Sequence, residues 1–155
     1  MARIFPFKPY RYSPKAGLID KLATQPYDKI SPGMQARYLA QSPYNLVRVI
    51  LGERLATDNE QQNLYTRAAG YLNDWIANGI LAQEAEPSVY AYFQEFAVPD
   101  TGEKLVRKGF IGLGAVEEYS ENIVHRHEQT LSGPKKDRME LLKHTHAHFG
   151  QIFML

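Results

Sequence analysis

The chain has 155 residues, the length of one ordinary domain that can bury a core of its own. Hydrophobic residues make up 44% and charged residues 23%, which excludes a chain that is disordered throughout. Eighteen Lys and Arg against seventeen Asp and Glu leave a net charge of +1, so no global field draws the chain to nucleic acid or anionic lipid. The absence of cysteine excludes disulfides, thiolate nucleophiles and cysteine metal sites.

The first thirty residues are predicted to form an extended arm rather than a long helix or strand. Four prolines remove amide donors there, and aromatic rings would hold the arm against the rest of the fold. Within it, Pro26 is a candidate cis proline, and Tyr27 and Asp28 form a polar group that serves either a structural turn or a ligand.

No run of ~18 apolar residues occurs, so we expect no membrane association and a cytoplasmic protein.

The middle of the chain predicts two helices separated by a strand. Ser31-Pro32 is typical of a helix start, and that helix ends near Gln41. The apolar, β-branched run Leu46–Leu51 favours a buried strand. Thr57, with Glu60 three residues later, has capping-box spacing and predicts a helix that ends at Asn78-Gly79.

A hairpin and a third helix follow. Residues 89–98 and 105–116 have strand composition around a turn at 99–102, and glycines in the second arm indicate a bulge or a close approach of another backbone. Ser132-Gly133-Pro134 begins a helix predicted to reach His148. The apolar end Ile152–Leu155 is typical of a strand entering a sheet, so we expect an N-terminal fragment of a longer protein that self-associates as a homo-oligomer.

These elements predict an α+β fold. The expected architecture is a mixed or mainly antiparallel sheet with three helices packed on it and an N-terminal extended arm. Residues 1–155 are predicted to form one domain, because no linker-like stretch divides the chain.

The start of the third helix carries an unusual set of cations. Lys135, Lys136 and Arg138 lie near the positive end of the helix dipole, where cations are disfavoured, and Asp137 compensates in part. A bound phosphate would compensate further, because helix amides and cations together favour anions. The alternative is a solvated run of charges.

The preceding loop carries His127, Glu128 and Thr130. A histidine beside a carboxylate can act as a general base, and the Thr130 hydroxyl could contact a phosphate. His144 and His148 share one helix face with Glu140, but the residue after His144 is not the glutamate that a zinc-protease helix requires, so we predict no metal ligand.

Several segments resemble the prokaryotic family catalogued as domain of unknown function 1015. The matching segments are Ile4-x-Pro6-Phe7-Lys8, Pro26-Tyr27-Asp28-x-Ile30, Ser42-Pro43-Tyr44-Asn45, Trp75 with Gly79-Ile80-Leu81, Tyr90-x-Tyr92, Gly109-Phe110-Ile111-Gly112, His127-Glu128-x-Thr130, Lys135-x-Asp137-Arg138 and Ile152-Phe153. The resemblance implies a longer protein that continues into an Asp-Gly-His-His-Arg motif. That motif is similar to one in nucleotide-using members of the ParB and sulfiredoxin superfamily, some of which are small-molecule kinases. The motif is missing from this sequence.

Two functions remain open from the sequence. In the first, the chain is the phosphate- or nucleotide-binding portion of a phosphotransferase-like enzyme. Thr130, Lys135 and Arg138 would bind phosphate, His127 and Glu128 would act on an acceptor, and Asp137, Tyr27 and Asp28 would support them. The cofactor is left open, with a magnesium-bound nucleotide as the candidate. In the second, these groups form an internal polar network in a non-catalytic domain. Nucleic-acid binding is disfavoured.

Overall fold

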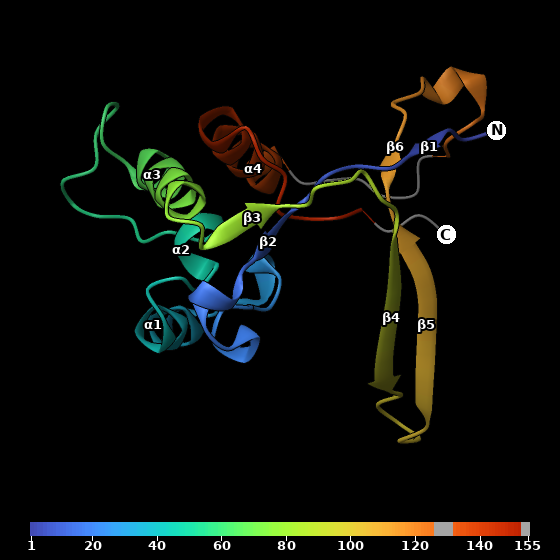
Figure 1. Ribbon diagram of the computed structural model, residues 1–155, viewed down its shortest axis with the longest axis horizontal. Helices are drawn as coiled ribbons and strands as arrows, with labels where there is room; N and C mark the ends of the chain where they lie inside the picture. Colours follow the sequence, from blue (N-terminus) through green and yellow to red (C-terminus); the bar gives the residue numbers. More distant parts are fainter. Residues whose placement is uncertain (126–131, 153–155) are drawn as a thin grey trace. The chain divides into compact units, whose positions relative to one another are not determined.

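A computed structural model describes residues 1–125 and 132–152 (Figure 1). The chain divides into two compact units, each built from two segments. Unit 1 contains the described residues of Met1–Pro9 and Gln83–Glu128, and unit 2 contains those of Tyr10–Ala82 and Gln129–Leu155. The predicted α+β class is confirmed. The prediction of one domain stays a prediction. The predicted strand at Ile152–Leu155 also stays one, because residues 153–155 lie outside the described part.

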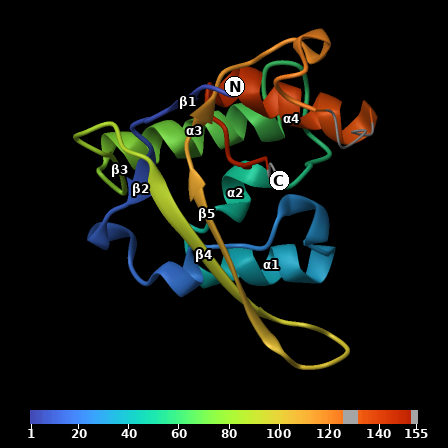
Figure 2. The ribbon, with the colours of Figure 1, turned by 90° about the vertical axis from the view of Figure 1, so that its right-hand side faces the viewer.

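Unit 2 is mainly helical and holds the core. Its helices are α1 (Pro32–Gln41), α2 (Val47–Ile50), α3 (Leu64–Ala77) and α4 (Ser132–Thr145), with the short strands β2 (Tyr10–Tyr12) and β3 (Leu81–Gln83) paired beside them. Trp75 of α3 lies at the centre, buried and in contact with the rings of Tyr12 and Tyr44. Figure 2 shows α4 lying alongside α3, and Leu141 is the residue that α4 buries in this core.

The arm has the predicted irregular form. Between β2 and α1 it consists of three 3₁₀ turns, the last of which is Tyr27–Lys29. The Tyr12 hydroxyl donates to the Tyr44 carbonyl at 2.8 Å, which fastens the arm to the core. Burial raises the pKa of Tyr12 far above its ordinary value, so this phenol stays a hydrogen-bond donor. The peptide bond before Pro26 is trans, so the cis prediction is wrong.

The predicted strand at Leu46–Leu51 is wrong, because this segment contains the helix α2. Asn45, which is completely buried, directs the chain into it: its Oδ1 accepts from the Val47 amide at 3.0 Å, and its Nδ2 donates to the Lys21 carbonyl at 2.8 Å. A short apolar run buried on all sides has no periodicity that separates strand from helix. Residues 1–125 and 132–152 therefore contain four α-helices, where three were expected.

The start of α3 and the end of α4 also differ from the prediction. The capping box of α3 is formed by Asn63 and Thr66, so the helix begins after the Thr57 predicted from spacing. Asp58 instead accepts from the Leu55 amide and pairs with Arg67. At the other end of the chain α4 stops at Thr145, because His146 takes a left-handed conformation with φ of 52°.

Unit 1 confirms the predicted hairpin. Strands β4 (Tyr90–Ala97) and β5 (Lys104–Ile111) pair antiparallel along their whole length, around a turn in which Gly102 has φ of 69°. The second pair is β1 (Ile4–Phe5) with β6 (Leu113–Gly114). Gly112 is the position where another backbone comes close, as predicted, and that backbone is β1. A Cβ at Gly112 would lie 3.0 Å from Ile4 Cγ2 and 3.3 Å from the Phe5 carbonyl oxygen.

No helix in the described part of the chain combines the length and apolar character needed to cross a membrane.

Candidate functional site

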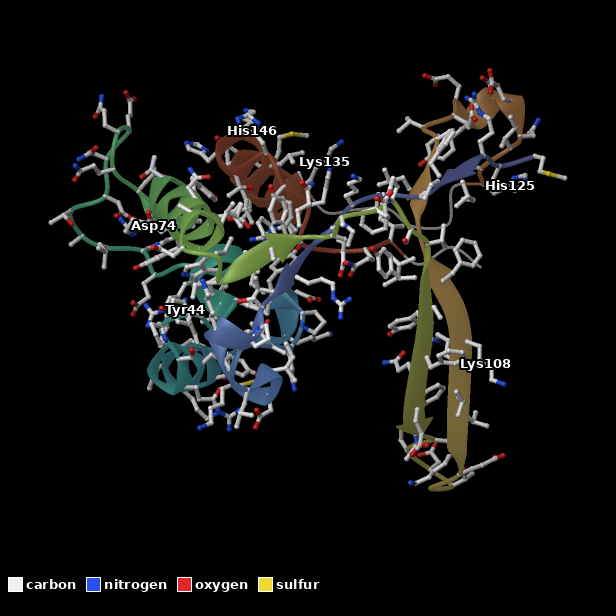
Figure 3. All side chains as sticks on the ribbon, in the orientation of Figure 1. Tyr44, Asp74, Lys108, His125, Lys135 and His146 are labelled. Atoms are coloured by element: carbon white, nitrogen blue, oxygen red, sulfur yellow. The ribbon has the colours of Figure 1, made fainter. Side chains whose placement is uncertain are left out.

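The cations of α4 differ in their surroundings. Lys135 and Lys136 are exposed at the start of the helix, and Figure 3 labels Lys135 there. Asp137 and Arg138 are partly buried, each with 28% of its side chain accessible. This is the pattern of a helix whose next residues turn toward α3 while its first turn stays in solvent.

Asp137 collects the hydrogen bonds of this region. Its Oδ1 accepts from the Tyr65 hydroxyl of α3 at 2.7 Å. Its Oδ2 accepts from Arg138, through Nε at 3.0 Å and through Nη2 in a shorter contact. The carboxylate therefore joins α4 to α3.

Arg138 extends the contacts to two further elements. Its Nη2 donates to the carbonyl of Ile50, the last residue of α2, at 2.8 Å. Its guanidinium lies over the ring of Tyr27, with Cζ 4.0 Å from the ring centre. A flat cation against an aromatic face is attracted by the ring quadrupole and held in one orientation.

The charges leave Asp137 ionised. Burial by itself would raise the pKa of Asp137, but the hydrogen bonds from Arg138 and Tyr65 and the positive charges of Arg138 and Arg54 outweigh it and lower the pKa. Burial and the same carboxylate raise the pKa of Tyr65, with Arg54 opposing them. One carboxylate thus lies near two arginines, with two exposed lysines on its own helix.

His144 joins this group by stacking on the ring of Tyr65. The two rings stack with centroids 5.7 Å apart and planes 26° apart. His144 Nδ1 lies 2.8 Å from the Glu140 backbone carbonyl, while the Glu140 carboxylate pairs with Lys143. Across residues 1–125 and 132–152, no three His, Asp or Glu side chains gather in a way that could hold a metal ion.

The structure brings together Tyr27, Asp137 and Arg138 of the predicted site. Lys135 is on the same helix, and Asp28 is exposed next to Tyr27. The predicted His127, Glu128 and Thr130 lie outside the described residues, so their convergence with Lys135 and Arg138 stays a prediction.

Sequence reasoning missed Tyr65, Arg54 and the Ile50 carbonyl. Tyr65 is 72 residues from Asp137 in the chain, and no local pattern links them. We call Tyr27, Arg54, Tyr65, Asp137, Arg138 and His144 the Asp137 cluster.

A pocket of about 260 Å³ lies elsewhere in unit 2, at the start of α3. It is lined by Leu55, Thr57, Asp58, Gln62, Thr66 and Arg67. Its acid, Asp58, is joined to Arg67 at 2.6 Å, and the hydrogen bond from Arg67 lowers the pKa of Asp58. None of the site residues predicted from the sequence lines this pocket.

The family described as "Protein of unknown function (DUF1015)" matches residues 4–155. No curated protein and no solved structure matches the chain.

Proposed function

The chain belongs to the DUF1015 family, and we propose that it is the phosphate- or nucleotide-binding portion of a phosphotransferase-like enzyme, with its anion site at the Asp137 cluster and the first turns of α4. Phosphoryl transfer depends chiefly on charge clamping and alignment, so a cation-rich surface is the part of such an enzyme that a binding portion must supply.

The observation that supports this proposal is the excess of positive charge around one carboxylate. Arg138 and Arg54 act on the Asp137 carboxylate, and Lys135 and Lys136 are exposed just before it, near the positive end of the α4 dipole. An anion placed there would be held by charge and by helix amides. A phosphate group supplies several acceptor oxygens for such donors.

The roles follow from how each side chain is held. Lys135 is exposed, so its ammonium group can reach a phosphate oxygen, whereas Arg138 lies against Tyr27 and presents its remaining N–H groups in a set direction. Thr130 would add a hydroxyl to the phosphate, and Asp28 would support Tyr27. His127 and Glu128 would position or deprotonate the acceptor, and a magnesium-bound nucleotide is the candidate donor. The kinship with ParB and sulfiredoxin proteins and the cytoplasmic location belong to the same proposal.

A second function is favoured by a specific observation. Arg138 is already bonded to Asp137 and to the Ile50 carbonyl, which is the arrangement of an internal polar network that fixes α4 to α2 and α3. In that case the cluster stabilises a non-catalytic domain and needs no ligand.

Substitution of the exposed lysine separates the two functions. For the phosphate site, Lys135→Ala removes stabilisation by inorganic phosphate or nucleotide but leaves the stability of the ligand-free protein unchanged. The matched control is Lys143→Ala, which removes the same charge from the last turn of α4 and keeps the response to ligand. Denaturant melts of the three proteins with and without phosphate measure this. A real site stabilises the unmodified chain by ~2.7 kcal/mol at a hundredfold excess of ligand over Kd.

Arg138→Ala provides the complementary readout. In the network it leaves Asp137 without its charged partner, and the ligand-free protein loses about 3–5 kcal/mol. If that loss is found while phosphate fails to stabilise the unmodified chain, the network is the function and the phosphate site is rejected.

A further inference from the structure

Among the described residues, no strand lies on the outer edge of β4. Within the described chain, β5 is the strand that pairs with β4. The Val98 amide donates to the Glu103 carbonyl at 2.8 Å, and bonded pairs alternate with non-bonded pairs along an antiparallel ladder. The backbone groups that point away from β5 are therefore those of Ala91, Phe93, Glu95 and Ala97.

Both faces of this hairpin are exposed. Phe93 and Phe110 lie on one face, with 66% and 62% of their surface accessible, and Phe96 and Leu105 lie on the other, with 37% and 41%. None of the described residues of unit 1 belongs to the buried hydrophobic core. A two-stranded hairpin alone is marginally stable in water, and three or more strands are needed for independent stability. The open edge is thus where an added strand would stabilise unit 1 most.

The two edges of the hairpin differ in charge. Strand β5 carries Lys104, Arg107 and Lys108, and Lys108 projects outward from it (Figure 3). Lysines on an edge strand are a common way to prevent pairing with other chains. Strand β4 carries Glu95 as its one charge, and Glu95 pairs with Lys104 at 3.0 Å. The edge of β4 is therefore aromatic and nearly neutral, whereas that of β5 is protected.

We propose that β4 pairs antiparallel with β4 of a second copy of this chain, which forms a four-stranded sheet in the order β5–β4–β4–β5. A two-fold interface places the same surface on both sides, so it must tolerate its own charges. The β4 edge meets this requirement, because two copies can pair without placing Glu95 of one copy opposite Glu95 of the other. Pairing of two β5 edges would place cations opposite cations.

The charges and lengths also select the register. When the two-fold axis passes through Gln94, Gln94 of one copy lies opposite Gln94 of the other. Phe93 of each copy then lies opposite Glu95 of the other, and Ala91 opposite Ala97. All four outward-pointing residues of β4 are then bonded. Moving the axis to Glu95 places two glutamates opposite each other, and moving it to Phe93 leaves Ala97 without a partner in the strand.

A charge-swap pair of variants tests both the dimer and its register. Ala91 and Ala97 are exposed, so both accept substitution. In the proposed register, Ala91→Lys with Ala97→Lys places lysines opposite lysines twice, while Ala91→Lys with Ala97→Glu places lysine opposite glutamate twice. Sedimentation equilibrium is expected to show a reversible dimer for the unmodified chain, dimerisation weakened about tenfold or more by the first pair, and recovery with the second.

A cross-link tests the register directly, because the chain has no cysteine of its own. In a non-bonded antiparallel pair the Cα atoms are ~4.5 Å apart, which lies within the range for a disulfide. Gln94→Cys is therefore expected to form a covalent dimer on mild oxidation. The matched control is Arg107→Cys, opposite Gln94 in the same hairpin. Its copies would be ~14 Å apart, three strand spacings, and would not cross-link.

Three results would overturn the proposal. They are a chain that stays monomeric at every concentration, a dimer that survives the lysine pair unchanged, and equal cross-linking of the two cysteine variants. Co-purification of nucleic acid or of a different protein with a monomeric chain would assign the edge to that occupant instead.

Discussion

Asp137 is the residue through which three parts of unit 2 are joined. It accepts hydrogen bonds from Tyr65 of α3 and from Arg138, and Arg138 in turn reaches the end of α2 and the ring of Tyr27. A carboxylate that is partly buried costs solvation, and this cost is offset only while both donors remain in place. Its ionised form is thus coupled to the packing of α4.

The first prediction concerns this carboxylate and pH. The pKa of Asp137 is lower in the folded chain than in the unfolded chain, so its stabilising contribution is complete above the unfolded pKa and is lost as pH falls through the folded pKa. Asp137→Asn is expected to cost about 1–3 kcal/mol at neutral pH and to flatten the loss of stability toward acid. Urea melts between neutral and acidic pH measure both effects.

Glu140→Gln is the control for that experiment. The hydrogen bond from Lys143, a neighbour on the same helix, lowers the pKa of Glu140, and this pair does not join α4 to another element. Its replacement is expected to leave the pH profile nearly unchanged. If Asp137→Asn behaves like Glu140→Gln, the cluster does not stabilise the fold.

The site could be predicted from the sequence at some residues and not at others. Asp137 and Arg138 are predicted because charge and dipole conflict at the start of a helix, and Tyr27 because it lies in a polar group beside Pro26; both are local features. Tyr65 and the Ile50 carbonyl could not be, because their contacts join segments 72 and 88 residues apart. Spacing along a chain carries no information on such pairs.

The elements show the same division between local and long-range information. The β4–β5 hairpin, the start of α1 at Ser31-Pro32 and the end of α3 at Asn78-Gly79 follow from short-range turn and cap chemistry, and each was predicted. The helix α2 was mistaken for a strand because buried Asn45 decides its conformation through contacts with Lys21. The start of α3 was misplaced because Thr57 and Asn63 both offer cap chemistry, and the spacing alone favoured Thr57.

Two glycines of unit 1 provide a matched test of how closely β1 and β6 pack. Gly112→Ala would push a methyl group into Ile4 and the Phe5 carbonyl, so it is expected to destabilise unit 1 by about 1–3 kcal/mol and to loosen the β1–β6 pair. Gly109→Ala, in the neighbouring strand β5, has no atom within 4 Å of its new methyl and is expected to be neutral or slightly stabilising. Chemical denaturation compares the two. Equal losses would mean that the close approach at Gly112 is unimportant.

Over the whole molecule, burial is distributed unevenly. The buried hydrophobic residues found in the described part all belong to unit 2, while unit 1 leaves aromatic side chains such as Phe93, Phe110 and Tyr119 exposed. A net charge of +1 conceals a similar asymmetry, because cations gather at the start of α4 and along β5. Composition therefore describes the chain correctly as globular and neutral but cannot reveal either of the surfaces that carry the two proposals.

The most direct test of the phosphate site is a titration of the whole ¹⁵N-labelled chain with inorganic phosphate and with a magnesium-bound nucleotide, followed by backbone amide shifts. A phosphate site at the start of α4 is expected to give saturable shifts confined to the first turns of α4, around Lys135 to Arg138, and to the turn at Tyr27, with the β4–β5 hairpin unaffected. Shifts that do not saturate, or that occur away from these two segments, would contradict it.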